Sequence, residues 1–273
     1  MDPRRLTYPG PGLARIGDML KNKIAVIYGA GGAIGGAVAR AFAADGAKLF
    51  LCGHVLAPVQ AVATELGADA AAVDATDEQA IDKHLSYVID KSGRIDISFN
   101  AMGIADHKVC GVPLLELDLA RFSLPISAYT TSYFLTARLA ARRMVPNKSG
   151  VIMTVSALPG RTGTALNGGY GAALAAKDAL TRDLSVELAL HGIRVVCLRP
   201  HGLPETDTMK DLHRLKASKM TYEQFQTHLA GMSHPRRTML LAEVADVAAF
   251  VASDKASGTM GTTVNLTMGG VSD

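Results

Sequence analysis

The sequence predicts a single α/β domain in which a seven-stranded parallel sheet is covered by helices on both faces. Two observations support this fold class. Short, nearly continuous apolar runs alternate with longer helical stretches, a pattern typical of parallel strands buried on both sides. In addition, no linker or shift in composition divides the chain after Asn22. The expected architecture is doubly wound, with right-handed crossovers between the strands.

The elements follow a regular order. The first strand spans residues 23–28 (KIAVIY), and a glycine-rich turn leads from it into a helix at 33–44. Apolar runs predict further strands at 47–52, 69–73, 95–100, 151–155, 193–198 and 262–266. Helices are expected at 55–66, 77–91, 120–144, 170–191 and 242–252. Pro125 is expected to kink or restart its helix, and the polar segment 203–237 is expected to be irregular with helical patches.

Composition excludes several classes of protein. A chain with 48% hydrophobic residues is too apolar to stay disordered. No run of about 18 apolar residues lacks a charge or a breaker, so no membrane span is expected. The net charge of +3 is too small to indicate a nucleic-acid partner. Cys52, Cys110 and Cys197 lack metal-ligand spacing, which indicates reduced thiols, a cytoplasmic protein and no metal site.

The first 22 residues are expected to form an extension outside the main domain, residues 23–273. They carry no apolar segment of the kind found in a secretory signal. A short helix is expected near residues 13–20.

The glycine-rich turn is a candidate dinucleotide site. Residues 29–36 (GAGGAIGG) follow the first strand and open directly into a helix. Glycines there allow a tight turn and the close approach of a pyrophosphate, which the free N–H groups at the helix start bind. After the first strand of a repeating strand–helix pattern, this turn predicts a Rossmann-type dinucleotide fold. A merely structural turn is the alternative.

Residues 23–270 resemble the short-chain dehydrogenase/reductase family. Its phosphate loop, T-G-x-x-x-G-x-G, corresponds to residues 28–35, in which Tyr28 replaces the threonine and Ala33 the middle glycine. Residues 100–103 (NAMG) match its N-N-A-G motif, and Asp74 matches its adenine-contacting aspartate. The resemblance implies an NAD(P)-dependent oxidoreductase that acts on the carbonyl or hydroxyl group of a small-molecule substrate.

The resemblance also implies which residues bind the cofactor. They are Gly29, Gly31, Gly32, Ile34, Gly35, His54, Asp74, Asn100, Gly103, Pro200, Leu203 and Thr206. An acidic residue at the end of the second strand would bind the ribose of NAD and repel the phosphate of NADP. Here that place holds no carboxylate, and His54 stands where NADP-using relatives often carry arginine. NADP is therefore favoured over NAD, with an ordinary exposed His54 as the alternative.

In this family catalysis uses a tyrosine, a lysine four residues later, a serine thirteen residues earlier and an asparagine on the preceding long helix. The lysine is needed because a free tyrosine hydroxyl is almost wholly protonated at neutral pH. Tyr170 matches the tyrosine and is the expected catalytic residue. The lysine and serine positions hold Leu174 and Ala157. The asparagine position holds Tyr129, or Ala128 if the register shifts by one residue.

Nearby residues do not obviously replace the missing groups. Lys177 lies about 10.5 Å along the helix from Tyr170, rather than about 6 Å. Ser156 is expected to face away from the site if the strand alternates regularly. His201 is either a substitute acid–base group or a space-filling loop residue. Tyr129 and Tyr133 either enter the pocket or pack on their helix, and His107 and Lys108 are expected to be solvated loop charges.

Three functions therefore stay open. The first is a reductase with weak or altered catalysis, the second a non-redox enzyme on this fold, and the third an NADP(H)-binding protein without catalysis. The helices at 120–144 and 170–191 are rich in small residues and resemble the family's dimer face. A homodimer or homotetramer is therefore expected.

Overall fold

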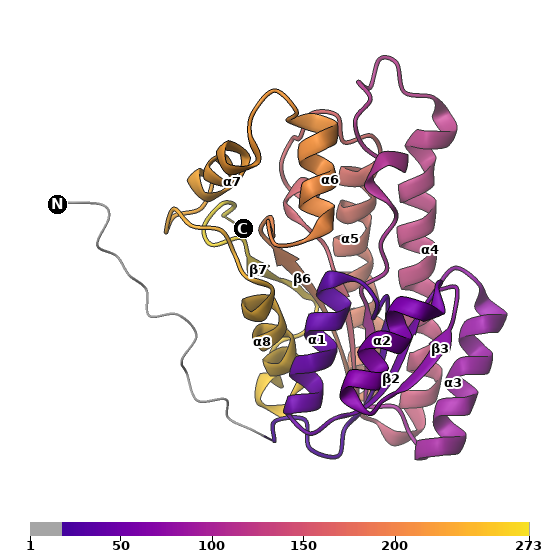
Figure 1. Cartoon of the computed structure of the whole chain (residues 1–273). Helices are drawn as coiled ribbons and strands as arrows, with labels where there is room; N and C mark the ends of the chain where they lie inside the picture. Colours follow the sequence, from indigo (N-terminus) through magenta and orange to yellow (C-terminus); the bar gives the residue numbers. More distant parts are fainter. Residues whose placement is uncertain (1–17, 273) are drawn as a thin grey trace.

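The computed structural model describes residues 18–272 and contains the expected parallel sheet (Figure 1). Its seven strands lie in the order β3-β2-β1-β4-β5-β6-β7. They are β1 (Ile24–Tyr28), β2 (Lys48–Gly53), β3 (Asp69–Ala72), β4 (Ile97–Asn100), β5 (Gly150–Val155), β6 (Ile193–Pro200) and β7 (Thr262–Leu266). The chain order reverses between β1 and β4, and in such sheets ligands bind beyond the carboxyl ends of the strands at this point.

Helices cover both faces of the sheet (Figure 1). One face carries α1 (Ala33–Ala44), α2 (Leu56–Leu66) and α8 (Leu241–Ala252), and the other carries α3 (Glu78–Ser92), α4 (Leu119–Met144) and α5 (Tyr170–Leu188). Neighbouring strand residues supply the two cores alternately. Ile27 packs with Val38 of α1, whereas Val26 packs in the core that contains Ile81 and Tyr133.

The structure defines two helical regions more closely than the sequence does. Pro125 lies within a single helix of 26 residues, so it does not restart α4. The segment expected to be irregular with helical patches contains two such helices, α6 (Asp207–Lys216) and α7 (Tyr222–Gly231). Both begin at a threonine whose hydroxyl accepts a hydrogen bond from a backbone N–H group. These caps stabilise helix starts in a stretch that is mostly polar.

The packed part of the chain begins before the expected boundary at Lys23. Leu20 is fully buried in the core, and its backbone N–H donates to the carbonyl oxygen of Asp45. Most of the helix expected near residues 13–20 lies outside the described residues, and residues 18–20 form a turn. None of the described helices is long and apolar enough to cross a membrane.

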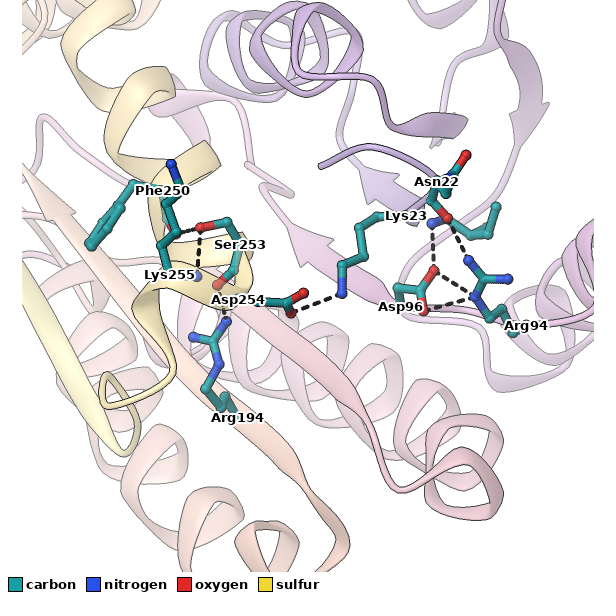
Figure 2. A network of polar contacts seen from close by, with 10 residues as sticks. Asn22, Lys23, Arg94, Asp96, Arg194, Phe250, Ser253, Asp254 and Lys255 are labelled. Carbon is teal, nitrogen blue, oxygen red and sulfur yellow. Dashed lines mark hydrogen bonds and ion pairs between the residues drawn. The ribbon is translucent and has the colours of Figure 1, made fainter. Parts of the chain in front are cut away.

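A polar network closes the amino-terminal end of the sheet (Figure 2). The Asp96 carboxylate accepts the backbone N–H of Ile24 at 2.7 Å and the Arg94 guanidinium at 3.0 Å. Nearby, Lys23 pairs with Asp254 at 2.9 Å, which links the start of β1 to the turn after α8. The network fixes this edge, and the cavity lined by the glycine-rich turn and Tyr170 lies at the opposite, carboxyl edge.

Candidate active site

Loops after β1, β4, β5 and β6 enclose a cavity of about 360 Å³ at the carboxyl edge of the sheet. Its wall includes the start of α1, the segment from Ala101 to Ile104, the end of β5 and the first turn of α5. Residues from β6 to α6 complete it. The cavity therefore lies where the chain order reverses, and it joins the glycine-rich turn to Tyr170.

The glycine-rich turn is shaped by close backbone contacts. Gly29 has φ +75°, and a Cβ atom there would lie 2.6 Å from the carbonyl oxygen of Ala101. A Cβ on Gly35 would lie 2.2 Å from the carbonyl oxygen of Gly29. Both distances are too short for a side chain, so these positions require glycine.

The start of α1 fits a pyrophosphate. The capping residue is Gly32, which provides no side-chain acceptor for the first N–H groups of the helix. Gly32, Ile34 and Gly35 line the cavity, whereas Gly31 faces Pro58 and a shallower depression nearby. Unpaired N–H groups and the helix dipole favour an anion at this place. The residues present thus fit the phosphates of a dinucleotide.

Tyr28 departs from the family motif without occupying the cavity. Its side chain is fully buried in the core formed with α3 and α4, on the face away from α1. Burial raises the pKa of its hydroxyl well above the ordinary value. The substitution therefore changes the packing beneath the turn.

His54 and Asp74 lie outside the cavity, after the ends of β2 and β3. His54 Nδ1 is 3.5 Å from Asp74 Oδ2, and the His54 side chain is 79% exposed. The Thr76 hydroxyl and backbone N–H donate to Asp74 Oδ1 at 2.7 and 2.8 Å, and these bonds lower the pKa of the carboxyl group. An exposed imidazole is thus available at the end of β2.

The Asn100 side chain is buried, and it forms its hydrogen bonds with other residues of the protein. Its Nδ2 donates to the hydroxyls of Ser132 and Thr136 at 3.1 and 3.0 Å, and its Oδ1 accepts the backbone N–H of Met102. The amide therefore ties the loop after β4 to α4. Gly103 of that loop lines the cavity.

The remaining expected cofactor residues come from the loop after β6. Pro200, Leu203 and Thr206 line the cavity. The Thr206 hydroxyl donates to the carbonyl oxygen of Leu203 at 2.8 Å and caps α6 by accepting the N–H of Met209. This pair of bonds holds the loop against the cavity.

Tyr170 begins α5 and lines the cavity beside Tyr129. Their ring centroids are 5.6 Å apart with an interplanar angle of 58°. The Tyr129 hydroxyl accepts the backbone N–H of Ile104 at 3.1 Å. Burial, then the neighbouring Tyr129, raises the pKa of Tyr170 well above its ordinary value. Tyr170 is thus a protonated hydrogen-bond donor in this environment.

The substituted family positions also face the cavity. Leu174 and Ala157 both line it, so an apolar surface stands where the family has an ammonium and a hydroxyl. Ser156 contributes to the wall, but its Oγ is buried and has no hydrogen-bond partner among the described residues. Ser156 therefore does not present a hydroxyl to the cavity that could replace the serine hydroxyl found in the family, whose position is held here by Ala157.

Lys177 lies behind the cavity wall. Its Nζ donates to the carbonyl oxygen of Val155 at 2.6 Å and stands 5.5 and 5.9 Å from the ring centroids of Tyr129 and Tyr133. Burial lowers the pKa of Lys177 to about 8. The lysine supports the end of β5 and the back of Tyr129, and it does not line the cavity.

Of the other candidate residues from the sequence, only His201 reaches the cavity. His201 lines the cavity, and both ring nitrogens are buried without a partner among residues 18–272. Burial lowers the pKa of His201, so its imidazole is neutral at neutral pH. Tyr133 is fully buried against Thr181 and does not enter the cavity. His107 and Lys108 are exposed loop residues, as expected.

One ionisable cavity residue was not predicted. Asp106 lines the cavity from the short turn after β4. No motif or spacing marks it in the sequence, and only its place after the fourth strand could have drawn attention to it. Within the described chain, no group of three or more histidine, cysteine, aspartate or glutamate side chains is arranged to hold a metal ion.

Comparisons with known proteins agree with this geometry. A family model described as enoyl-(acyl carrier protein) reductase matches residues 29–271. Secoisolariciresinol dehydrogenase from Forsythia intermedia is 30% identical over 255 residues, which cover 91% of this chain and 89% of that protein. Cis-4-hydroxycyclohexanecarboxylate dehydrogenase from Sinomonas cyclohexanicum is 33% identical over 251 residues, covering 90% and 95%.

Solved structures share the fold. Sorbitol-6-phosphate 2-dehydrogenase SrlD from Erwinia amylovora has a TM-score of 0.85 at 26% identity, covering 91% of this chain and all of that one (100%). NAD⁺-bound xylitol dehydrogenase has a TM-score of 0.83 at 24% identity, covering 90% and 98%. The sheet order, the cavity beside the glycine-rich turn and these matches lead to one conclusion: the chain belongs to the short-chain dehydrogenase/reductase family of oxidoreductases.

Proposed function

We propose that this protein is an NADP(H)-dependent oxidoreductase that interconverts a carbonyl and a hydroxyl group, with slower chemistry than a complete set of family residues would give. The observation that carries the proposal is one cavity that joins the uncapped start of α1 to Tyr170. Two relatives are named as dehydrogenases of secoisolariciresinol and cis-4-hydroxycyclohexanecarboxylate, which supports a hydroxylated or carbonyl substrate.

Different residues along the cavity would bind different parts of the cofactor and the substrate. The first turn of α1 would hold the phosphates, and the loop with Pro200, Leu203 and Thr206 would border the nicotinamide. A bound nicotinamide cofactor supplies or accepts hydride. Tyr170 donates a hydrogen bond, and in reduction a proton, to the substrate oxygen. Without an ammonium at Leu174 the resulting phenolate is poorly stabilised, which slows the proton transfer.

The proposed choice of NADP depends on the end of β2. His54 is exposed there, and no carboxylate of β2 is present to repel a 2′-phosphate. NADPH oxidation should be measured against NADH oxidation with a panel of ketones, aldehydes and quinones. We expect NADPH to give the higher kcat/KM. The variant His54→Asp should shift the ratio toward NADH by about tenfold, because one charge contact to phosphate contributes on the order of 1.4 kcal/mol.

His191→Asp is a matched control, since it makes the same substitution in the exposed turn just before β6, at the opposite edge of the sheet. It should leave the cofactor ratio unchanged. A wild-type enzyme that prefers NADH would contradict the choice of NADP. Absence of turnover with every carbonyl compound would contradict hydride transfer.

A second candidate function is dinucleotide binding without hydride transfer. It is favoured by the joint presence of Leu174, Ala157 and Tyr129 at the cavity wall. Calorimetry separates the two. Tight NADPH binding together with no turnover would favour a binding protein or a non-redox enzyme, and no binding would exclude both NADP-dependent functions.

We also propose that the chain forms a homodimer or homotetramer through α4 and α5. Apolar side chains are exposed on both helices, among them Leu119 at 77%, Phe134 at 40% and Val186 at 77%. Pairing these helices between copies would remove that surface from water. Multi-angle light scattering should give twice or four times the chain mass, whereas a 28.6 kDa species would refute the proposal.

A further inference from the structure

Asp106 is an unpartnered carboxyl group in the candidate active site. It lies in the turn Asp106–Lys108 after β4, is partly buried, and shares the cavity wall with Tyr129 and Tyr170. Its carboxyl group forms no ion pair and no hydrogen bond with another described residue. A carboxylate withdrawn from water without a partner is unfavourable, so a cationic ligand would stabilise it.

The basic groups around this turn have other partners. On α6, Lys216 donates to the Oδ1 atom of Asn167. On α4, Arg121 donates to the carbonyl oxygens of His107 and Cys110, at 2.7 Å in each case. None of these cations lines the cavity. Neither side chain forms an ion pair with Asp106.

Among the neighbouring charged groups, Asp211 opposes a negative charge on Asp106. Asp211 of α6 pairs with Arg214, and Tyr129 and Tyr170 face the same cavity as neutral hydroxyls. Burial, and then the negative charge of Asp211, raise the pKa of Asp106 to about 6. His107 and Lys216 lower it, but by less. Asp106 is thus mostly ionised at pH 7.5 and mostly protonated at pH 5.

The rest of the cavity wall is largely apolar. Met102, Ile104, Leu174, Leu203 and Met209 contribute to it, and no lysine or arginine of the described chain does. A ligand that fits this wall carries an apolar body. It also places one positively charged donor at the carboxylate, because charge-assisted hydrogen bonds are stronger than neutral ones.

We propose that Asp106 makes this cavity selective for substrates that carry a protonated amine on an apolar body. The ammonium group binds the Asp106 carboxylate while the carbonyl or hydroxyl group lies at Tyr170. This inference rests on the proposed function, because it assigns a substrate class to the same site. Asp106 contacts the part of the substrate that does not react, so it is a specificity residue.

Binding calorimetry on the full-length protein tests this without turnover. The probes are cyclohexylamine, which is protonated at pH 7.5, and cyclohexanol, which has the same ring and stays neutral. Both are measured with and without NADPH. We expect cyclohexylamine to bind about 10- to 100-fold more tightly, the range of one hydrogen bond between charged groups. At pH 5 its affinity should fall about tenfold, because about a tenth of Asp106 remains ionised.

Two variants separate Asp106 from its surroundings. Asp106→Asn should abolish the preference for the amine and its pH dependence while leaving NADPH binding unchanged. Asp211→Asn should keep the preference and move its loss to lower pH, because a charge that raises the pKa of Asp106 is removed. Equal affinity for the two probes, including no binding by either, would overturn the proposal, as would an unchanged preference in Asp106→Asn.

A kinetic comparison distinguishes this inference from the proposed function. The substrates are 4-aminocyclohexanone and 4-hydroxycyclohexanone, which differ only in the charged group. Asp106→Asn should raise KM for the amine about 10-fold or more, while KM for the hydroxy ketone should change much less. If neither ketone is reduced although the amine probe binds preferentially, the oxidoreductase function fails and the ammonium site stands. If both are reduced with equal KM, the ammonium site fails and the function stands.

Discussion

Restoring a lysine and a serine to the cavity, with Leu174→Lys and Ala157→Ser together, should raise kcat for carbonyl reduction by about 100-fold or more. Both side chains face the cavity that contains Tyr170, and Leu174 lies one helical turn beyond the tyrosine. An ammonium there would stabilise the tyrosine phenolate, and the serine hydroxyl would bind the substrate oxygen. Acid–base assistance of this kind contributes about 10²–10⁴-fold to enzyme rates.

The matched control is Leu174→Met with Ala157→Ser, which keeps an apolar side chain of similar volume at position 174. It should remain within a few-fold of the wild-type rate. The restored variant should also show a lower apparent pKa for Tyr170 in its pH–rate profile. Equal rates for the wild type and the restored variant would mean that another group already supplies this chemistry.

Breaking the ion pair between Arg199 and Asp178 should have the largest effect on stability, about 3–5 kcal/mol of unfolding free energy. Their side chains are 3% and 7% exposed, and Arg199 lies 2.6 Å from Asp178 Oδ2. Thr263 donates to the other carboxylate oxygen at 3.0 Å. Removing the carboxylate by Asp178→Ala leaves a buried guanidinium without this partner, which explains the large cost. Urea unfolding followed by circular dichroism measures it.

The exposed pair between Arg40 and Glu65 provides the control. Its side chains are 46% and 49% exposed, so Glu65→Ala should cost far less than Asp178→Ala. Replacing both buried partners, with Asp178→Leu and Arg199→Met, should recover part of the loss, because the guanidinium that has lost this carboxylate is removed as well. Similar costs for Asp178→Ala and Glu65→Ala would show that the buried pair has no special role.

The sequence predicts the sheet well because its signals are local. Each buried strand appears as its own apolar run, and β7 has the bounds expected from the sequence. The phosphate turn was equally visible, since its glycines satisfy backbone requirements within a few residues of one another. Pro125 does not restart α4, because it removes only one backbone hydrogen bond and because Tyr133 and Leu139, further along the helix, pack in the core.

The chemistry of the site was less predictable because it depends on contacts between distant segments. Nothing near Asp106 in the sequence indicates that Tyr129 and Tyr170 share its cavity. The same holds for Lys177, whose ammonium reaches Val155 on β5 and the rings of α4. Spacing along α5 shows that Lys177 is too far from Tyr170, but only the packing shows what it contacts.

The close contacts at Gly29 and Gly35 limit which substitutions this sequence can accept during evolution. Any side chain at either position would collide with the backbone, at 2.6 Å from Ala101 and 2.2 Å from Gly29. Selection for folding alone therefore retains both glycines, even in a lineage that has stopped using a dinucleotide. Tyr28 and Ala33 show that the turn accepts change where space allows it. The two glycines therefore indicate the family from which the fold descends, but they do not show that a cofactor is bound today. Evidence for cofactor binding comes instead from the uncapped start of α1 and the cavity beside it.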